Sequence, residues 1–206
     1  MSHILKHVLI LVLFLSLSVK IFAESSNRTL APKNTTENAK LFLQQHINDI
    51  FKTLRDDSLN IADKKQVLAP ILRKLVNFQL ISKLIIGRTH WKQLSTEERS
   101  RFGIAFEKHL LDSYLSKLIL FSNEKLYLDK AQKAKGKVSI IGRIITKKDT
   151  LSITFKLYFP KKWQLYDIEV EGVSILQSYQ AQFRPLLKSK SIDAIIHNLK
   201  QVPAET

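Results

Sequence analysis

The side chains best suited to chemistry stand close together near residue 170. Gly172, Val173 and Ser174 begin like the G-x-S-x-G turn that exposes a nucleophilic serine in hydrolases. Leu176 stands where that turn needs its second glycine, so the motif is incomplete. A serine at the start of a helical segment is typical of an N-cap, and we interpret Ser174 in this way.

Tyr166 and Asp167 are a second candidate, because these residue types can form an acid–base pair of the ketosteroid isomerase kind. Adjacent residues of a strand point to opposite faces, so only one of the two is expected to face a pocket. The five glycines form no phosphate-binding loop, and the histidines show no metal-ligand spacing. We therefore expect no catalytic residue, no metal site, no cofactor and no enzymatic activity.

Hydrophobic periodicity predicts helices in the first half of the chain. One begins near Glu37, a second covers Ala62–Leu75, and the nearly all-apolar segment Phe78–Ile86 predicts a helix buried on most faces. The first helix carries a single apolar stripe, formed by Leu43, Ile47, Ile50 and Leu54.

A long helix is predicted from Ser95, which forms a capping box with Glu98, to about Phe121. It carries two apolar stripes, Phe102-Phe106-Leu110-Tyr114 and Ile104-Leu111-Leu115-Leu118. Two stripes are expected of the wall of a cavity, but also of a central helix packed on both sides. Both interpretations remain open.

From Glu124 the apolar period changes to two, which indicates strands. Four are predicted: Lys125–Lys130, Lys137–Lys147, Thr150–Phe159 and Trp163–Glu171. Their short connections require antiparallel neighbours. Helices over Val173–Leu187 and Ile192–Leu199 close the chain. The expected fold class is α+β, with a strongly curved, four-stranded antiparallel meander packed against N-terminal and C-terminal helices around an apolar cavity.

Apolar positions on the inward faces of these elements are the candidates for the cavity wall. They are Leu84, Phe106, Leu110, Tyr114, Ile153, Phe155, Leu157, Tyr166, Ile168 and Val170. The alternative is that these positions form an ordinary close-packed core.

The N-terminus has the plan of a secretory signal peptide, with a basic Lys6 before the apolar run Val8–Val19. That run is short, because a membrane-spanning helix needs about 20 apolar residues. The chain has no cysteine, hence no disulfide and no lipoprotein anchor, which favours release into the bacterial periplasm. The expected parts are a signal peptide (1–23), a flexible leader (24–36), a single folded domain (37–200) and a tail (201–206).

The net charge of +15 is concentrated in the strands, where Lys125–Lys162 contains eleven basic residues and two acidic ones. In a meander the first and third connections lie at the same end of the sheet. The lysines expected at that end are Lys130, Lys133, Lys135, Lys137, Lys161 and Lys162. They are candidates for docking on an anionic bilayer or an acidic partner. The alternative is that they are solvated turn residues in a lysine-rich sequence. An exported protein meets little nucleic acid, so none is expected as a partner.

Two separated blocks of sequence resemble a known family. One runs from Trp163 through Tyr166-Asp167-Ile168 to Gly172-Val173-Ser174 and continues with Tyr179, Phe183 and Ile192–Ile196. The other comprises Ile81–Trp91 and Ser95–Phe102. Together they resemble the MlaC, or toluene-tolerance, family of periplasmic phospholipid carriers in the pathway that maintains lipid asymmetry. The chain departs from the family pattern at Val76-Asn77, in the turn after Gly87, and at Lys190-Ser191.

The resemblance implies a monomeric protein whose shape is similar to the nuclear transport factor 2 fold. It also implies a phospholipid as cargo and no cofactor. It implies a shuttle between an outer-membrane lipoprotein–porin complex and an inner-membrane ABC transporter with its substrate-receiving domain. Alternatives are a carrier of hopanoid or another lipid, and a periplasmic adaptor of the same fold that binds no lipid.

Overall fold

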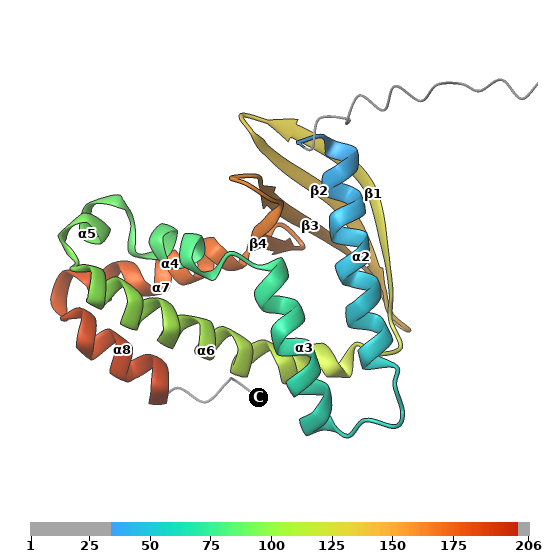
Figure 1. Ribbon diagram of the computed structural model, residues 1–206, viewed down its shortest axis with the longest axis horizontal. Helices are drawn as coiled ribbons and strands as arrows, with labels where there is room; N and C mark the ends of the chain where they lie inside the picture. The colour runs from blue at the N-terminus through green and yellow to red at the C-terminus, as the bar shows by residue number, and fades with distance from the viewer. Residues whose placement is uncertain (1–33, 202–206) are drawn as a thin grey trace, which may run out of the picture. The chain divides into compact units, whose positions relative to one another are not determined.

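The structure is a computed structural model that describes residues 34–201 (Figure 1). The expected signal peptide, the leader up to residue 33 and the tail from residue 202 lie outside the described residues. Helix α2 (Thr36–Leu54) begins where Thr35 accepts a hydrogen bond from the backbone N–H of Asn38, 3.1 Å away. The helix thus starts one residue inside the expected leader. All four residues of its apolar stripe are buried, as predicted.

Helices α3 (Ile61–Leu75) and α4 (Phe78–Ile86) each begin at an asparagine. Asn60 accepts a hydrogen bond from the N–H of Asp63 at 3.0 Å, and Asn77 accepts one from the N–H of Leu80 at 2.8 Å. Gly87 then takes a positive φ of 79° and separates α4 from a short helix, α5 (Arg88–Gln93). The sequence analysis did not predict α5 and placed a turn there.

Helix α6 (Thr96–Leu120) is the longest helix within residues 34–201 and has the predicted capping box. The Ser95 side chain accepts from the N–H of Glu98, and the Glu98 carboxylate accepts from the N–H of Ser95. The first predicted stripe is buried as far as Leu110. The second is interrupted, because Ile104 is 69% exposed.

The sheet is an antiparallel meander with the strand order β1-β2-β3-β4-β5, which confirms the predicted topology. Its strands are β1 (Lys125–Ala134), β2 (Lys137–Ile145), β3 (Thr150–Tyr158), β4 (Gln164–Val170) and β5 (Val173–Ser174). The two-residue β5 was not predicted. It follows a turn in which Glu171 and Gly172 both take positive φ, the conformation that tight hairpins favour.

Two irregularities shape the sheet. The pairing of β1 with β2 shifts between Leu128 and Ala131, and that of β3 with β4 shifts between Lys156 and Leu157. In β4 the extra residue is Tyr166, because Asp167 pairs with Lys156 while Leu165 already pairs with Leu157. Such a bulge bends a strand and breaks the alternation of its faces.

Helix α2 lies along strands β1 and β2, while α4, α6, α7 (Ile175–Ser189) and α8 (Ile192–Gln201) form a group on the other side of the described unit (Figure 1). Lys40 of α2 donates to the carbonyl of Asp129 in β1 at 3.0 Å. In the helical group, Gln180 of α7 donates to the carbonyl of Leu84 in α4 at 2.9 Å. Within residues 34–201, no helix combines the length and the apolar character needed to cross a membrane.

Candidate functional site

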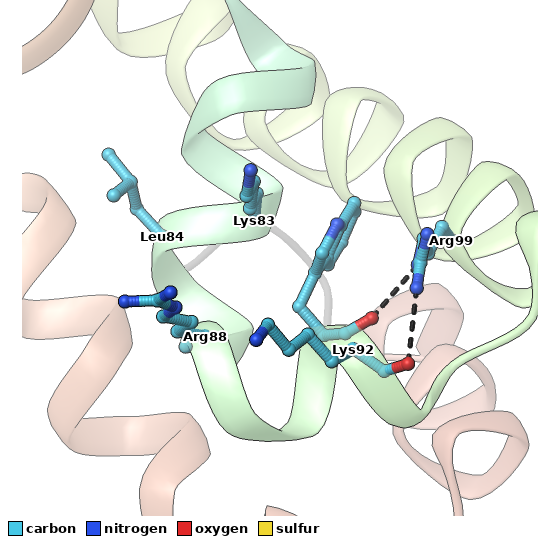
Figure 2. Close-up of a pocket in the computed structure, with 7 residues that line it drawn as sticks. Lys83, Leu84, Arg88, Lys92 and Arg99 are labelled. Carbon is cyan, nitrogen blue, oxygen red and sulfur yellow. Dashed lines mark hydrogen bonds between the residues drawn. The ribbon is translucent and has the colours of Figure 1, made fainter.

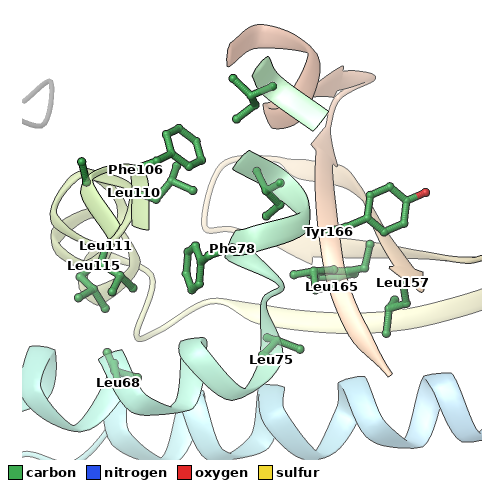
Figure 3. Close-up of a cluster of buried hydrophobic side chains, with 14 of the residues drawn as sticks. Leu68, Leu75, Phe78, Phe106, Leu110, Leu111, Leu115, Leu157, Leu165 and Tyr166 are labelled. Carbon is green, nitrogen blue, oxygen red and sulfur yellow. The ribbon is translucent and has the colours of Figure 1, made fainter. Parts of the chain in front are cut away.

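An apolar cavity of about 390 Å³ lies between the sheet and the surrounding helices. Buried side chains from α3, α4 and α6 lie beside it (Figure 3). Only three of its lining residues are charged: Lys117, Glu124 and Asp167. A cavity with such a wall can hold apolar groups but offers few partners for polar ones.

Eight of the ten predicted wall residues line this cavity. They are Phe106, Leu110 and Tyr114 of α6, Ile153 and Phe155 of β3, and Tyr166, Ile168 and Val170 of β4. The structure thus brings together residues that are up to 64 positions apart in the sequence. Whether they contact a lipid stays a prediction.

The other two predicted residues lie elsewhere. Leu84 faces a separate, open hollow beside α5, because its position on α4 turns it away from the sheet. Leu157 is fully buried but does not line the cavity. Its strand partners Val138 and Leu165 are also buried, and of these three residues only Leu165 lines the cavity. Placing these two residues on the wall is therefore corrected.

Tyr166 and Asp167 both line the cavity, whereas the sequence analysis allowed only one of them to face it. The bulge at Tyr166 explains this, because it removes the strict alternation that the prediction assumed. Burial raises the pKa of the Tyr166 hydroxyl above its usual value. The ammonium of Lys137 lies 5.0 Å from the centre of the Tyr166 ring, within cation–π range.

The Asp167 carboxylate holds the start of α7. It accepts hydrogen bonds from the Ser174 hydroxyl at 2.7 Å and from the N–H of Leu176 at 3.0 Å. Ser174 in turn accepts from the N–H of Gln177, which confirms it as the N-cap of α7. These contacts give Asp167 and Ser174 a structural role at a helix N-terminus.

Lys156 completes this network by contacting Asp167 at 3.0 Å and Glu169 at 2.7 Å. Burial alone would lower the pKa of Lys156. Its hydrogen bonds to Glu169 and Asp167 outweigh that effect, and the pKa is raised. Both oxygens of the buried Asp167 carboxylate are thus engaged with protein groups.

The cavity also has walls that the sequence analysis did not assign. Leu43, Ile47 and Ile50 of α2 contribute to the lining, as do Leu72 and Leu75 of α3. The apolar stripe of α2 predicted that its residues are buried. It could not predict that they face the same space as the sheet, because that depends on a contact between segments far apart in the chain.

The cavity opens beside the C-terminal end of α6. Of all its lining residues, only Tyr114, Lys117 and Phe121 are exposed. Tyr114 and Lys117 stand at i and i+3 and share one face of α6, and Phe121 is the C-cap residue that follows the helix. We call these three residues the mouth.

The six predicted docking lysines are all exposed. The register places Lys137 opposite both Ala134 and Tyr158, and Tyr158 opposite Gln164. The turn between β1 and β2 therefore lies at the same end of the sheet as the β3–β4 connection with Lys161 and Lys162. Two of these lysines have partners within the chain: Lys133 donates to the carbonyl of Asn34 at 2.8 Å, and Lys137 lies over the Tyr166 ring.

No cluster of His, Asp or Glu side chains that could hold a metal ion is found in the described part of the chain.

A model of the family described as "MlaC protein" matches residues 44–201, more than half of the chain. The chain belongs to the MlaC family. The resemblance inferred from the two sequence blocks is thereby confirmed. A curated relative from Haemophilus influenzae, an intermembrane phospholipid transport system binding protein, is 23% identical, and the match covers 78% of this chain and 80% of that protein.

A solved structure supports the fold of this member of the MlaC family. It is the phospholipid-binding protein of Ralstonia solanacearum in complex with a phospholipid. It matches with a TM-score of 0.70 at 18% sequence identity, covering 79% of this chain and 95% of the other. At this identity the match establishes a shared fold.

Proposed function

We propose that this protein is a periplasmic phospholipid carrier that holds acyl chains in the cavity and leaves the head group at the mouth. The observation that carries the proposal is the apolar cavity whose exposed lining residues form a single group, Tyr114, Lys117 and Phe121. Each buried methylene contributes about 0.8 kcal/mol, so ten of them contribute about 8 kcal/mol. Acyl chains need no polar partners, and the wall supplies few.

The family supports the wider role. The Haemophilus relative is named for intermembrane phospholipid transport, and the Ralstonia structure holds a phospholipid. We propose that the protein carries phospholipid between an outer-membrane lipoprotein–porin complex and the substrate-receiving domain of an inner-membrane ABC transporter. In this role it helps to maintain outer-membrane lipid asymmetry as a monomer without cofactor.

The proposal requires export, for which residues 1–23 would be the cleaved signal peptide. N-terminal sequencing of the protein recovered from periplasm should begin at Glu24. Recovery of the uncleaved chain in the membrane fraction would contradict both the cleavage and the periplasmic location.

We propose that the protein carries lipid and does not catalyse a reaction on it. Asp167 is engaged by Ser174, Leu176 and Lys156, so it is not available as a base beside Tyr166. A broad lipase and esterase screen should therefore give no turnover. Hydrolysis that is lost on changing Ser174 or Asp167 would overturn this part of the proposal.

Native mass spectrometry of the purified protein tests carriage directly. Protein bound to phospholipid is expected, and delipidated protein should take up added phospholipid again. A bare protein that binds no added lipid would instead support the adaptor of the same fold. Analysis of the extracted lipid separates phospholipid from hopanoid, because only the former contains phosphorus.

We also propose that the exposed lysines at one end of the sheet orient the carrier toward an anionic bilayer or an acidic partner. Each basic residue near an anionic surface contributes about 1 kcal/mol. The ten residues of β1 extend about 33 Å from the mouth to this end, so the lysines would act on the approach and not on lipid entry.

Replacing Lys133, Lys135, Lys161 and Lys162 with glutamate tests this role. Lipid delivery should slow at low salt, while the amount of lipid bound per protein stays unchanged. The difference from the unmodified protein should shrink as salt screens the charges. Equal delivery rates across a salt titration would leave these lysines as solvated turn residues.

A further inference from the structure

A second hollow lies at the opposite end of α6 from the mouth. It has a volume of about 650 Å³ and is formed where α4, α5 and the start of α6 meet (Figure 2). Four of its seven lining residues are basic and none is acidic: Lys83, Arg88, Lys92 and Arg99. It shares no lining residue with the cavity. We call it the α5 basic pocket.

One of the four basic residues has a clear structural role. Arg99 donates from Nε to the carbonyl of Trp91 at 2.9 Å and from Nη2 to that of Lys92 at 3.3 Å (Figure 2). Its guanidinium also lies 5.7 Å from the centre of the Trp91 ring. Arg99 therefore fixes the C-terminal part of α5 against α6.

The other three basic residues do not stabilise the fold by pairing. No carboxylate of residues 34–201 lies within ion-pair distance of Lys83, Arg88 or Lys92. Lys83 and Lys92 stand in the last turns of α4 and α5, where the helix dipole favours a cation. Arg88 is the first residue of α5, where the dipole disfavours one. The presence of Arg88 at this position is therefore not explained by a contribution to helix stability.

The shape of the pocket discriminates between two kinds of anionic ligand. A bilayer presents a broad surface, whereas carboxylate side chains that project from a protein can enter a hollow. Guanidinium groups bind carboxylates through two parallel hydrogen bonds, and the Arg88 side chain makes no hydrogen bond or ion pair within residues 34–201.

The position of the pocket also favours a protein partner over a bilayer. Arg99 and Lys117 are eighteen residues apart on α6, which is about 27 Å along the helix axis. A bilayer held at the pocket would keep the mouth far from its surface. A protein bound there would leave the mouth open for lipid exchange.

We propose that the α5 basic pocket is a docking site for an acidic segment of a protein partner. The occupant is identified by charge complementarity: a segment rich in Asp or Glu whose carboxylates meet Arg88, Lys83 and Lys92. The argument about the mouth rests on the proposed function. The observations on the pocket are independent of the proposed function, because they consist of the pocket's shape, its charge and its lack of acidic partners within the described chain.

Titration with an oligoglutamate peptide of about ten residues tests the site at low salt. The double variant Arg88→Glu/Lys92→Glu removes the attraction, and its affinity for the peptide should fall about tenfold or more. Lys147→Glu/Lys148→Glu is the matched control, because it makes the same change of charge at exposed lysines in the β2–β3 turn. The control should retain most of the affinity. Arg99 is left unchanged because it holds α5.

Equal losses in the two double variants would show that the peptide senses only net charge, and would overturn the site. Vesicles of anionic phospholipid provide the second arm. If Arg88→Glu/Lys92→Glu loses vesicle binding but keeps peptide binding, the pocket serves a bilayer and the proposal is wrong. Native mass spectrometry of both variants measures the bound lipid independently of peptide binding. A protein without lipid would contradict the proposed lipid carriage. The peptide titration would still test the docking site in that case.

Discussion

The two halves of α6 face very different interiors. In the N-terminal half, Phe102 is fully buried, stacks on Phe106 at 5.8 Å between ring centres, and meets the edge of Phe183 at 5.9 Å. In the C-terminal half, Leu110 and Tyr114 line the cavity. The same helix is thus part of a filled core at one end and of a cavity wall at the other.

The difference follows from the side chains that α6 meets. The Phe183 ring of α7 lies beside Phe102, and such aromatic pairs add about 0.5–1.5 kcal/mol beyond the burial of their area. The cavity that Leu110 lines is bounded by aliphatic and aromatic residues of the sheet and of α2, which leave a space of about 390 Å³ between them. Because the helix is continuous, the filled half holds the cavity wall in place without filling the cavity.

Phe102→Ala should give the largest change in stability, because it leaves a hole in the filled half. Substitutions of this kind cost about 3–5 kcal/mol. The measurement is the free energy of unfolding in urea, and lipid bound per folded molecule should be unchanged. A loss below about 1 kcal/mol would show that this half also contains empty space.

Leu110→Trp and Phe155→Trp should fill the cavity half. Both should abolish lipid binding in native mass spectrometry while the fold survives, because a cavity tolerates volume that a close-packed core rejects. Leu157→Trp is the matched control on the same face of β3, and overpacking there should cost about 1–3 kcal/mol. Unfolding of the Leu110 and Phe155 variants would show that these positions belong to a filled core.

Ser174→Ala should give the smallest effect, about 1 kcal/mol, through loss of the α7 N-cap. Helix α7 contributes Phe183 to the filled half and Leu176 to the cavity wall, so this variant tests whether loosening one half disturbs the other. Lipid affinity should stay unchanged. A large loss of affinity at unchanged thermal stability would instead place Ser174 near the bound head group.

Local signals explain what the sequence analysis predicted correctly. The capping box of Ser95 and Glu98, the N-cap at Ser174 and the alternation in β3 each depend on residues within a few positions of one another. They place the start of α6, the start of α7 and the inward face of the sheet. The five cavity-lining positions predicted on α6 and β3 follow from these elements.

The features that were not predicted depend on pairing between segments. The bulge at Tyr166 arises from the register of β4 against β3, and with it both Tyr166 and Asp167 line the cavity. The basic pocket combines side chains from three helices, one of which the sequence analysis took for a turn. The available signal was Gly87 followed by Arg88, Trp91 and Lys92, which has the spacing of a short helix.

The meander order also affects how the chain folds. Each strand pairs with the next one along the chain, so its hairpins close short loops, and hairpins form in about 1–10 μs. Helix α2 meets β1 only through long-range contacts, such as that between Lys40 and Asp129, which are 89 residues apart. We expect α2 to cover the sheet late in folding. Until it does, the apolar side of the sheet remains exposed to other unfolded chains, and this is the stage at which aggregation is most favoured.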